Sequence, residues 1–256
     1  MHERHPVFRE PENQNAKIWR YMDFTKFVYL LEKESLFFNR SDKFEDPYEG
    51  SLNQFTIDQY RQGYFRTVNA EEEMKELIFN SMLKDFEVSR KWVTINCWHM
   101  NEFESDAMWK LYLKSNEGIA IQSTYDRFCK SFNKTEESIF IGKVQYEDFN
   151  VFNIPLSNDL YRYLVKRKSF EHEKELRAVN WEVPSSEDEG GKYVDYSLTP
   201  PAFGKNIDID INMLIERVYI APDSPSWIKK LVDAMLKKYG LESVEVVHSS
   251  LGRYIK

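Results

Sequence analysis

The segment from Lys168 to Arg177 carries the side chains best suited to acid–base chemistry. Glu173 and Glu175 are two residues apart, so on a strand both carboxylates point to one face, together with Arg177. Two such carboxylates repel, and one pKa rises unless the arginine compensates. The pattern suits general-base work or a hold on ribose hydroxyls, and the alternative is a solvated, charge-balanced edge strand. If the preceding helix continues through the segment, the shared face is lost.

A second polar segment runs from Cys97, in a predicted strand, to Trp109, in a predicted helix. Turns from strand to helix present backbone N–H groups and the positive end of the helix dipole. Ser105 or Asp106 is the expected helix cap, and His99 then faces a ligand bound at the helix N-terminus. A capped helix with an incidental histidine is an equally good interpretation.

Arg20 stands between Trp19 and Tyr21 on the first predicted strand. An arginine there can hold a phosphate or carboxylate through two parallel hydrogen bonds, and an adjacent tyrosine can stack on a base or a nicotinamide ring. Residue types alone favour a plainer interpretation, an exposed arginine beside two core aromatic side chains.

The polar stretch 40–50 reads as a loop and contains Asp46 and Glu49 between aromatic residues. These carboxylates are candidates for accepting hydrogen bonds from ligand hydroxyls, for capping a helix or for positioning a metal. The alternative is a turn in which Asp46 bonds nearby backbone N–H groups ahead of Pro47.

Several well-known site chemistries have no sequence signature here. The nine glycines form neither a dinucleotide-binding fingerprint nor a phosphate-binding loop, and the chain has no nucleophile elbow and no zinc-protease motif. Cys97 and His99 are the only close Cys/His pair, and Cys129 and His248 would have to complete a zinc site. We predict no metal site, because the usual second ligand pair is absent.

Composition bounds the class of protein. The 256 residues are 15% aromatic, which is atypical of disorder, and the net charge of −7 disfavours extended binding to nucleic acid. No apolar run is long enough to span a bilayer, and the charged N-terminus lacks the apolar stretch of a secretory signal. We therefore expect a cytoplasmic protein that does not enter membranes.

The elements that must position these residues mix without strict alternation, so we predict a single α+β domain of mixed, mostly antiparallel sheet packed by helices. A flexible leader is expected over 1–16 and the domain over 17–256. Strands are predicted at 17–22, 36–39, 92–98, 119–124, 139–147, 175–183, 192–198, 206–211, 215–221 and 244–248. Helices are predicted near 24–31, 52–66, 70–86, 107–113, 125–133, 158–169 and 225–238, and 184–191 reads as a loop.

Taken together and in order, these segments resemble the bacterial "domain of unknown function 2971" family over roughly residues 17–250. The matching motifs are Phe44-Glu-Asp-Pro-Tyr-Glu49, Cys97-Trp-His99, Ser105-Asp-Ala-Met-Trp-Lys-Leu-Tyr112, Gly118-Ile-Ala-Ile121 and the run from Lys168 through Glu173 and Glu175 to Arg177. This resemblance implies a shared fold but no activity.

The same order is more distantly similar to that of ADP-ribosyltransferases, and this similarity implies NAD as a substrate. It implies roles for Arg20, Ser105 and Glu175, with Glu173 as the partner of Glu175 and with His99 and Tyr21 as accessory residues. We therefore predict that Glu175, Glu173, Ser105 and His99 are catalytic. Ligand contacts are then expected from Arg20, Tyr21, Asp46, Glu49, Trp109, Tyr112, Lys168 and Arg177. The first hypothesis is therefore an effector that transfers ADP-ribose or hydrolyses NAD, with a small nucleotide-type ligand.

The second hypothesis is a non-catalytic module that binds a ligand or a protein, for example a sensor in a defence system. A metal-dependent nuclease using Asp46, Glu49, Glu173 and Glu175 is the least favoured of the three. Convergence of Arg20 and the other candidates on one concave pocket separates the first two hypotheses. The sequence does not determine the oligomeric state.

Overall fold

The chain folds around one long strand, β4 (Val93–Met100), in a computed structural model that describes residues 1–113, 116–188 and 190–251. The other strands of the main sheet are β1 (His2–Glu3), β2 (Lys17–Asp23), β3 (Ser35–Arg40), β5 (Gly118–Thr124), β6 (Ile139–Lys143), β9 (Glu175–Trp181), β12 (Gly204–Asp208), β13 (Arg217–Ile220) and β14 (Glu245–His248). Two small ribbons pair β7 (Gln145–Glu147) with β8 (Val165–Arg167), and β10 (Ser185–Asp188) with β11 (Gly191–Val194).

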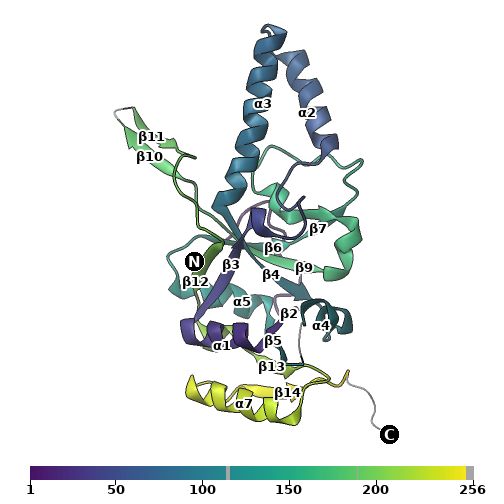
Figure 1. Ribbon diagram of the computed structural model, residues 1–256, viewed down its shortest axis with the longest axis vertical. Coiled ribbons are helices and arrows are strands. Elements are labelled where there is room, and N and C mark those ends of the chain that lie inside the picture. Colours follow the sequence, from purple (N-terminus) through teal and green to yellow (C-terminus); the bar gives the residue numbers. More distant parts are fainter. Residues whose placement is uncertain (114–115, 189, 252–256) are drawn as a thin grey trace.

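Helices connect and cover these strands (Figure 1). The α-helices are α1 (Phe24–Lys33), α2 (Gln54–Thr67), α3 (Glu72–Ser89), α4 (Asp106–Tyr112), α5 (Tyr125–Ser131), α6 (Ile211–Leu214) and α7 (Ser226–Lys238). The 3-10 helices are η1 (Ser41–Lys43), η2 (Arg90–Trp92), η3 (Phe132–Lys134), η4 (Tyr161–Leu164) and η5 (Lys168–Glu173). In the part of the chain that the structure describes, no helix is both long enough and apolar enough to cross a membrane.

The main sheet forks at β4. Its order is β1-β6-β9-β4-β2-β5-β13-β14, and all pairings are antiparallel except β1 with β6 and β13 with β14. Along one side, β9 pairs with β4 from Val93 to His99. On the other side, β3 pairs only at Thr94 and Ile95, and β2 pairs only at His99 and Met100. The sheet therefore opens between β2 and β3, and β12 continues the β3 branch.

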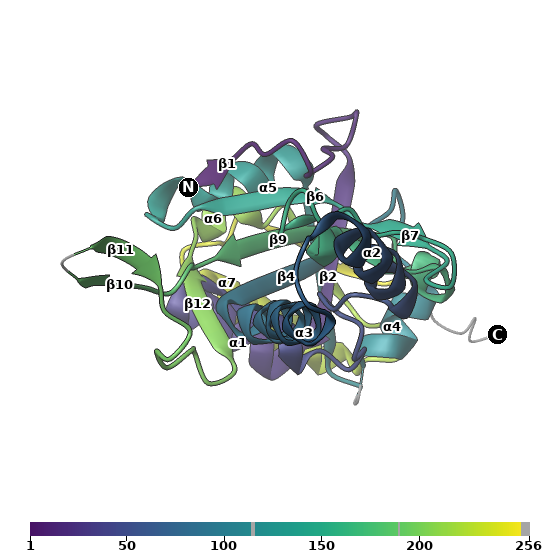
Figure 2. The same cartoon turned by 90° about the horizontal axis from the view of Figure 1, so that it is seen from above.

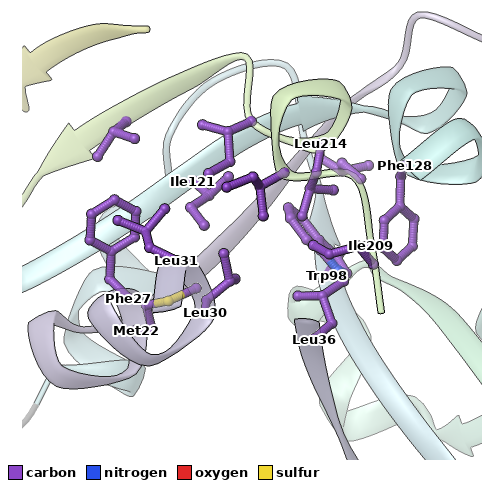
Figure 3. Close-up of a cluster of buried hydrophobic side chains, with 14 of the residues drawn as sticks. Met22, Phe27, Leu30, Leu31, Leu36, Trp98, Ile121, Phe128, Ile209 and Leu214 are labelled. Carbon is purple, nitrogen blue, oxygen red and sulfur yellow. The ribbon is translucent and has the colours of Figure 1, made fainter. Parts of the chain in front are cut away.

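The two faces of β4 bury different cores because its side chains alternate across the sheet. Trp98 packs against Phe128 of α5 in the largest cluster, which also contains Phe27 of α1 (Figure 3). Ile95 lies in a second cluster on the opposite face, with Tyr163 of η4. Burying each such side chain stabilises the fold by about 1.5–3 kcal/mol.

Helices α2 and α3 form a hairpin that projects away from the sheet (Figures 1 and 2). Phe79 of α3 is fully buried against Tyr60, Tyr64 and Phe65 of α2, with ring centroids about 6 Å apart. The Arg61 guanidinium lies 4.9 Å from the centroid of the Phe65 ring. The hairpin therefore has a small core of its own.

The segment 1–16, expected to be a flexible leader, packs against the domain. Strand β1 pairs in parallel with β6, and Phe8 is buried in the second core cluster. Gly142 of β6 leaves room for this contact, since a Cβ there would lie 2.8 Å from Phe8 Cα. The two prolines and the charged residues of this segment suggested a flexible leader, although Phe8 anchors it to the domain.

Two element predictions are wrong. The segment 158–169 is not one helix but contains η4, β8 and the start of η5. Five consecutive residues, 162–166, are buried, which an amphipathic helix does not allow. The predicted loop 184–191 contains β10 and leads into β11. This ribbon stands out in solvent, so its strands need no alternating apolar pattern.

The other predicted helices and strands are confirmed in type, with shifted ends, whereas β1 and α6 were not predicted. The confirmed caps include Asp23, which accepts from Lys26 N, and Ser105, which accepts from Met108 N. The predicted strand 139–147 is divided into β6 and β7, and the predicted strand 206–211 ends early because Ile211 begins α6. The chain is thus a single α+β domain with a mixed, mostly antiparallel sheet.

Gly204 should be required for the β3–β12 branch of the fork. Its φ is +152°, and a Cβ there would lie 2.0 Å from the Phe38 carbonyl oxygen. We expect Gly204→Ala to lower the free energy of unfolding by roughly 2 kcal/mol or more. Gly63, inside α2 with open space around it, is the matched control, and Gly63→Ala should raise stability by about 0.5–1 kcal/mol. Urea denaturation measures both, and equal effects would contradict the close packing.

Candidate active site

The fork in the sheet contains a cavity of about 580 Å³. Its walls come from β2, α1, β3, β4 and α4, and the carboxyl-bearing residues Glu173 and Glu175 close one side. Because Trp98 and His99 both line it and alternate along β4, the cavity reaches through the gap between β2 and β3. Aromatic side chains dominate the lining: Trp19, Tyr21, Tyr29, Phe37, Phe44, Trp98 and Tyr112.

Two cations line the cavity, Arg20 and Lys26, and Lys26 is paired with Asp23. Arg20 Nη1 donates to the Cys97 carbonyl oxygen at 2.6 Å and to Asn96 Oδ1 at 3.3 Å, which fixes the guanidinium against β4. Within residues 1–113, 116–188 and 190–251, no carboxylate forms a salt bridge with it. Burial lowers the pKa of Arg20, but an arginine stays protonated in proteins. An uncompensated cation in a partly apolar cavity favours an anionic ligand group.

Glu175 is held in place by two cations at the start of β9. Arg177 Nε donates to its Oε2 at 2.5 Å, and Lys166 Nζ donates to its Oε1 at 2.8 Å. Burial alone would raise the pKa of Glu175, but Arg177, a hydrogen bond from Glu173 and Lys166 together hold it well below its usual range. The Tyr146 hydroxyl also accepts from Glu175 N at 2.7 Å. Glu175 is therefore a fixed, ionised carboxylate at the cavity wall.

Arg177 connects this strand to the loop 40–50. Its side chain is fully buried, donates through both terminal nitrogens to the Glu49 carboxylate, and donates to the Tyr163 carbonyl oxygen at 2.6 Å. Burial opposes the charge, yet Glu175 and Glu49 hold the pKa of Arg177 above its ordinary value. Glu49 and Arg177 do not line the cavity, so they position Glu175 from behind.

Glu173 is the titratable member of the cluster. Its Oε2 accepts from Lys166 Nζ at 2.6 Å. Burial, together with the hydrogen bond to Glu175 and its charge, raises the pKa of Glu173 to about 7. Three carboxylates, Glu49, Glu173 and Glu175, face two cations, Lys166 and Arg177. A proton on Glu173 therefore makes the cluster neutral, and Glu173 can exchange that proton near neutral pH.

The backbone geometry that brings Glu173 and Glu175 together differs from the prediction. Glu173 ends η5, outside the strand, and Lys174 between them adopts a left-handed conformation with φ of 41°. Of the three residues predicted to share a face, only Glu175 and Arg177 lie on one face of β9. The shared-face argument for Glu173 is therefore wrong, although both carboxylates bind Lys166.

His99 lies directly opposite Glu175 in the β4–β9 register. Its Nδ1 is 2.6 Å from the Glu173 carbonyl oxygen. Burial lowers the pKa of His99, although this hydrogen bond opposes the shift, and the ring is neutral at neutral pH.

Tyr21 links the cavity to α4. Its hydroxyl accepts from Ser105 N at 2.8 Å, and Trp109 packs edge-on against its ring at 4.9 Å. Ser105 caps α4 and Trp109 is buried in a third cluster, so both support Tyr21 without lining the cavity. Tyr112, at the end of α4, lines the cavity and is 46% exposed.

The structure divides the predicted site residues into three groups. Arg20, Tyr21, His99, Tyr112, Glu173 and Glu175 line the cavity, and Ser105, Trp109, Glu49 and Arg177 support that lining. Asp46 and Lys168 lie apart from it. Asp46 accepts from Arg167 Nη2 at 2.9 Å and from Tyr48 N, as the turn interpretation predicts, and Lys168 is exposed.

Lys166 is the residue of the candidate site that sequence reasoning missed. It lies in the basic run 166–168, of which only Lys168 was selected, and it binds both glutamates. The signal was its place between buried neighbours, because a lysine is rarely buried without a carboxylate partner. The carboxylates proposed for a nuclease are already paired: Asp46 with Arg167, and the three glutamates with Lys166 and Arg177. Among the described residues, no cluster of three or more His, Cys, Asp or Glu could hold a metal ion.

Comparison of the chain with protein-family models, with curated proteins and with solved structures found no match.

Removing Arg177 should destabilise the protein strongly. Arg177→Met leaves Glu49 and Glu175 buried without their main cation, so we expect a loss of about 3–5 kcal/mol. Arg217 forms an exposed pair with Glu245, and Arg217→Met should cost less than about 1 kcal/mol. Denaturant unfolding compares the two variants. Similar losses would mean that the buried cluster does not hold the site together.

The raised pKa of Glu173 should appear in the pH dependence of stability. Between 4.5, the ordinary value, and about 7, the folded protein binds more protons at this group than the unfolded chain does. The contribution of Glu173 to the free energy of unfolding therefore falls as the pH rises through this range and is constant above it. Glu173→Gln should remove that decline, whereas Glu171→Gln, at an exposed position, should keep it. Unfolding free energies at pH 5, 6, 7 and 8 test this, and a decline that persists in Glu173→Gln would contradict it.

Proposed function

We propose that this cavity binds an NAD-type dinucleotide and that the protein is an enzyme resembling ADP-ribosyltransferases and NAD glycohydrolases. One observation carries the proposal: the uncompensated Arg20 and the Glu173–Glu175 pair line the same aromatic cavity. Its volume of about 580 Å³ falls within the usual range of small-molecule sites. An enzyme that consumes NAD in this way is expected to act in the cytoplasm.

Each part of the cavity suits one part of such a ligand. Arg20 offers a guanidinium to the diphosphate, and the aromatic walls offer stacking surfaces to the rings. Glu175 keeps its charge at any pH near neutrality, so it can accept from ribose hydroxyls and stabilise positive charge that develops on the ribose. These roles need an ionised carboxylate, which Lys166 and Arg177 maintain.

The proposed reaction breaks the bond between ribose C1′ and the nicotinamide nitrogen, and the bonding electron pair leaves with nicotinamide. The resulting oxocarbenium-like centre is attacked by the oxygen of water or by a nucleophile of an acceptor. Glu173, with a pKa of about 7, takes the proton that the nucleophile loses. Glu175 does not change its protonation state during this cycle.

A ligand-binding module without turnover is the second candidate. It is favoured by the two oxygens of Glu175, which both accept hydrogen bonds from cations already. It is also favoured by Ser105, which caps α4 instead of lining the cavity. Under this interpretation the same ligand binds, but no bond breaks.

Release of nicotinamide from NAD tests the enzyme directly. We expect release by the wild-type protein, with Glu175→Gln slower by roughly 100-fold or more. Arg20→Met should weaken NAD binding by roughly 10-fold or more, because it removes the charge-assisted contact. Chromatographic assay of nicotinamide and calorimetric binding measure the two effects.

Glu187, exposed on the projecting ribbon of β10, is the matched control. Glu187→Gln should behave as wild type in both assays. NAD binding by the wild type without nicotinamide release, over a broad set of acceptors, would favour the binding module. Absence of both binding and release would remove NAD as the ligand.

A further inference from the structure

His99 carries a hydrogen-bonding capacity that the folded chain does not use. The Glu173 carbonyl oxygen can only accept, so the proton of the neutral ring must sit on Nδ1, which donates to it at 2.6 Å. Nε2 is then a bare acceptor. It is buried and has no hydrogen-bond partner among the residues that the structure describes, while the whole residue is only 7% exposed.

An unpaired, buried acceptor of this kind is unfavourable. A buried acceptor without a donor loses its hydration and gains nothing in return. His99 also lines the cavity, so a ligand there whose N–H reaches the covered Nε2 can supply the missing donor. The neighbouring Glu175 is an ionised carboxylate, so this side of the cavity disfavours an anionic group and favours an N–H.

We infer that His99 is a specificity-determining residue whose Nε2 accepts a hydrogen bond from the carboxamide N–H of the ligand's nicotinamide. This inference rests on the proposed function. His99 lies opposite Glu175 in the sheet register, and Glu175 is the carboxylate assigned to the ribose that bears nicotinamide. A base on that ribose therefore lies beside His99. The site then selects NAD over the analogue in which nicotinic acid replaces nicotinamide.

The tautomer of His99 can be tested without any ligand. In nitrogen-15 NMR spectra of the wild-type protein, we expect Nδ1 to carry the proton and Nε2 to show the shift of an unprotonated ring nitrogen. The His99→Phe spectrum assigns the signal among the five histidines of the chain. A proton on Nε2 would overturn the inference, whatever the protein binds.

The selectivity is tested by binding NAD and nicotinic acid adenine dinucleotide to Glu175→Gln protein, in which turnover is suppressed. We expect NAD to bind at least about 10-fold more tightly. Adding His99→Phe should reduce that preference by about 3- to 10-fold, the usual effect of one hydrogen bond. His99→Gln, which keeps an acceptor oxygen, should restore part of it. His248→Phe, on the exposed edge strand β14, is the control and should change nothing.

The two possible failures differ. If NAD binds but its preference over the acid analogue is the same in His99→Phe, the inference falls and the proposed function stands. If wild-type protein neither binds NAD nor releases nicotinamide, the proposed function falls and takes this inference with it. Melting temperatures of the variants confirm that each one is folded.

Discussion

The buried contact between Arg177 and two glutamates is the interaction on which the rest of the site depends. Its guanidinium joins Glu175, on the central sheet, to Glu49, in a loop more than a hundred residues earlier in the chain. Because the Arg177 charge is desolvated, its ion pairs add little to net stability. They fix the geometry of the site instead, since few arrangements satisfy all three side chains. The loop 40–50, η4 and β9 are brought to one place by the same side chain.

The cavity is a consequence of incomplete pairing along β4. One edge is paired along most of its length by β9, while β2 and β3 each cover only an end of the other edge. The unpaired middle brings Asn96 and the Cys97 carbonyl oxygen within reach of Arg20. A partner strand along the whole edge would bond to the Cys97 carbonyl oxygen in place of Arg20 and close the opening. The cavity thus exists because the middle of this edge of β4 has no partner strand.

The sequence predicted the fold class and most elements, because apolar periodicity and helix caps are local signals. Six of the residues that line the cavity were predicted from the spacing of polar residues and from the family resemblances. The sequence missed Lys166, since a buried lysine is recognised only through partners that are distant in the chain. It misjudged how Glu173 joins Glu175, because the left-handed turn at Lys174 has no glycine to announce it. The prediction of a flexible leader over 1–16 failed for a similar reason: Phe8 and Pro11, two isolated buried residues in a mostly polar segment, give no period.

The projecting α2–α3 hairpin has a consequence for how such chains can diverge. Its aromatic side chains pack on one another, and its attachment lies at the base, where Asn53 donates to the Phe152 carbonyl oxygen and Arg162 donates to the Phe86 carbonyl oxygen. Neither helix lines the cavity in the fork. Insertions of two helical turns into each helix would preserve the phase of the packed face and leave the cavity untouched. The length of the α2–α3 hairpin can therefore change during evolution without altering the cavity.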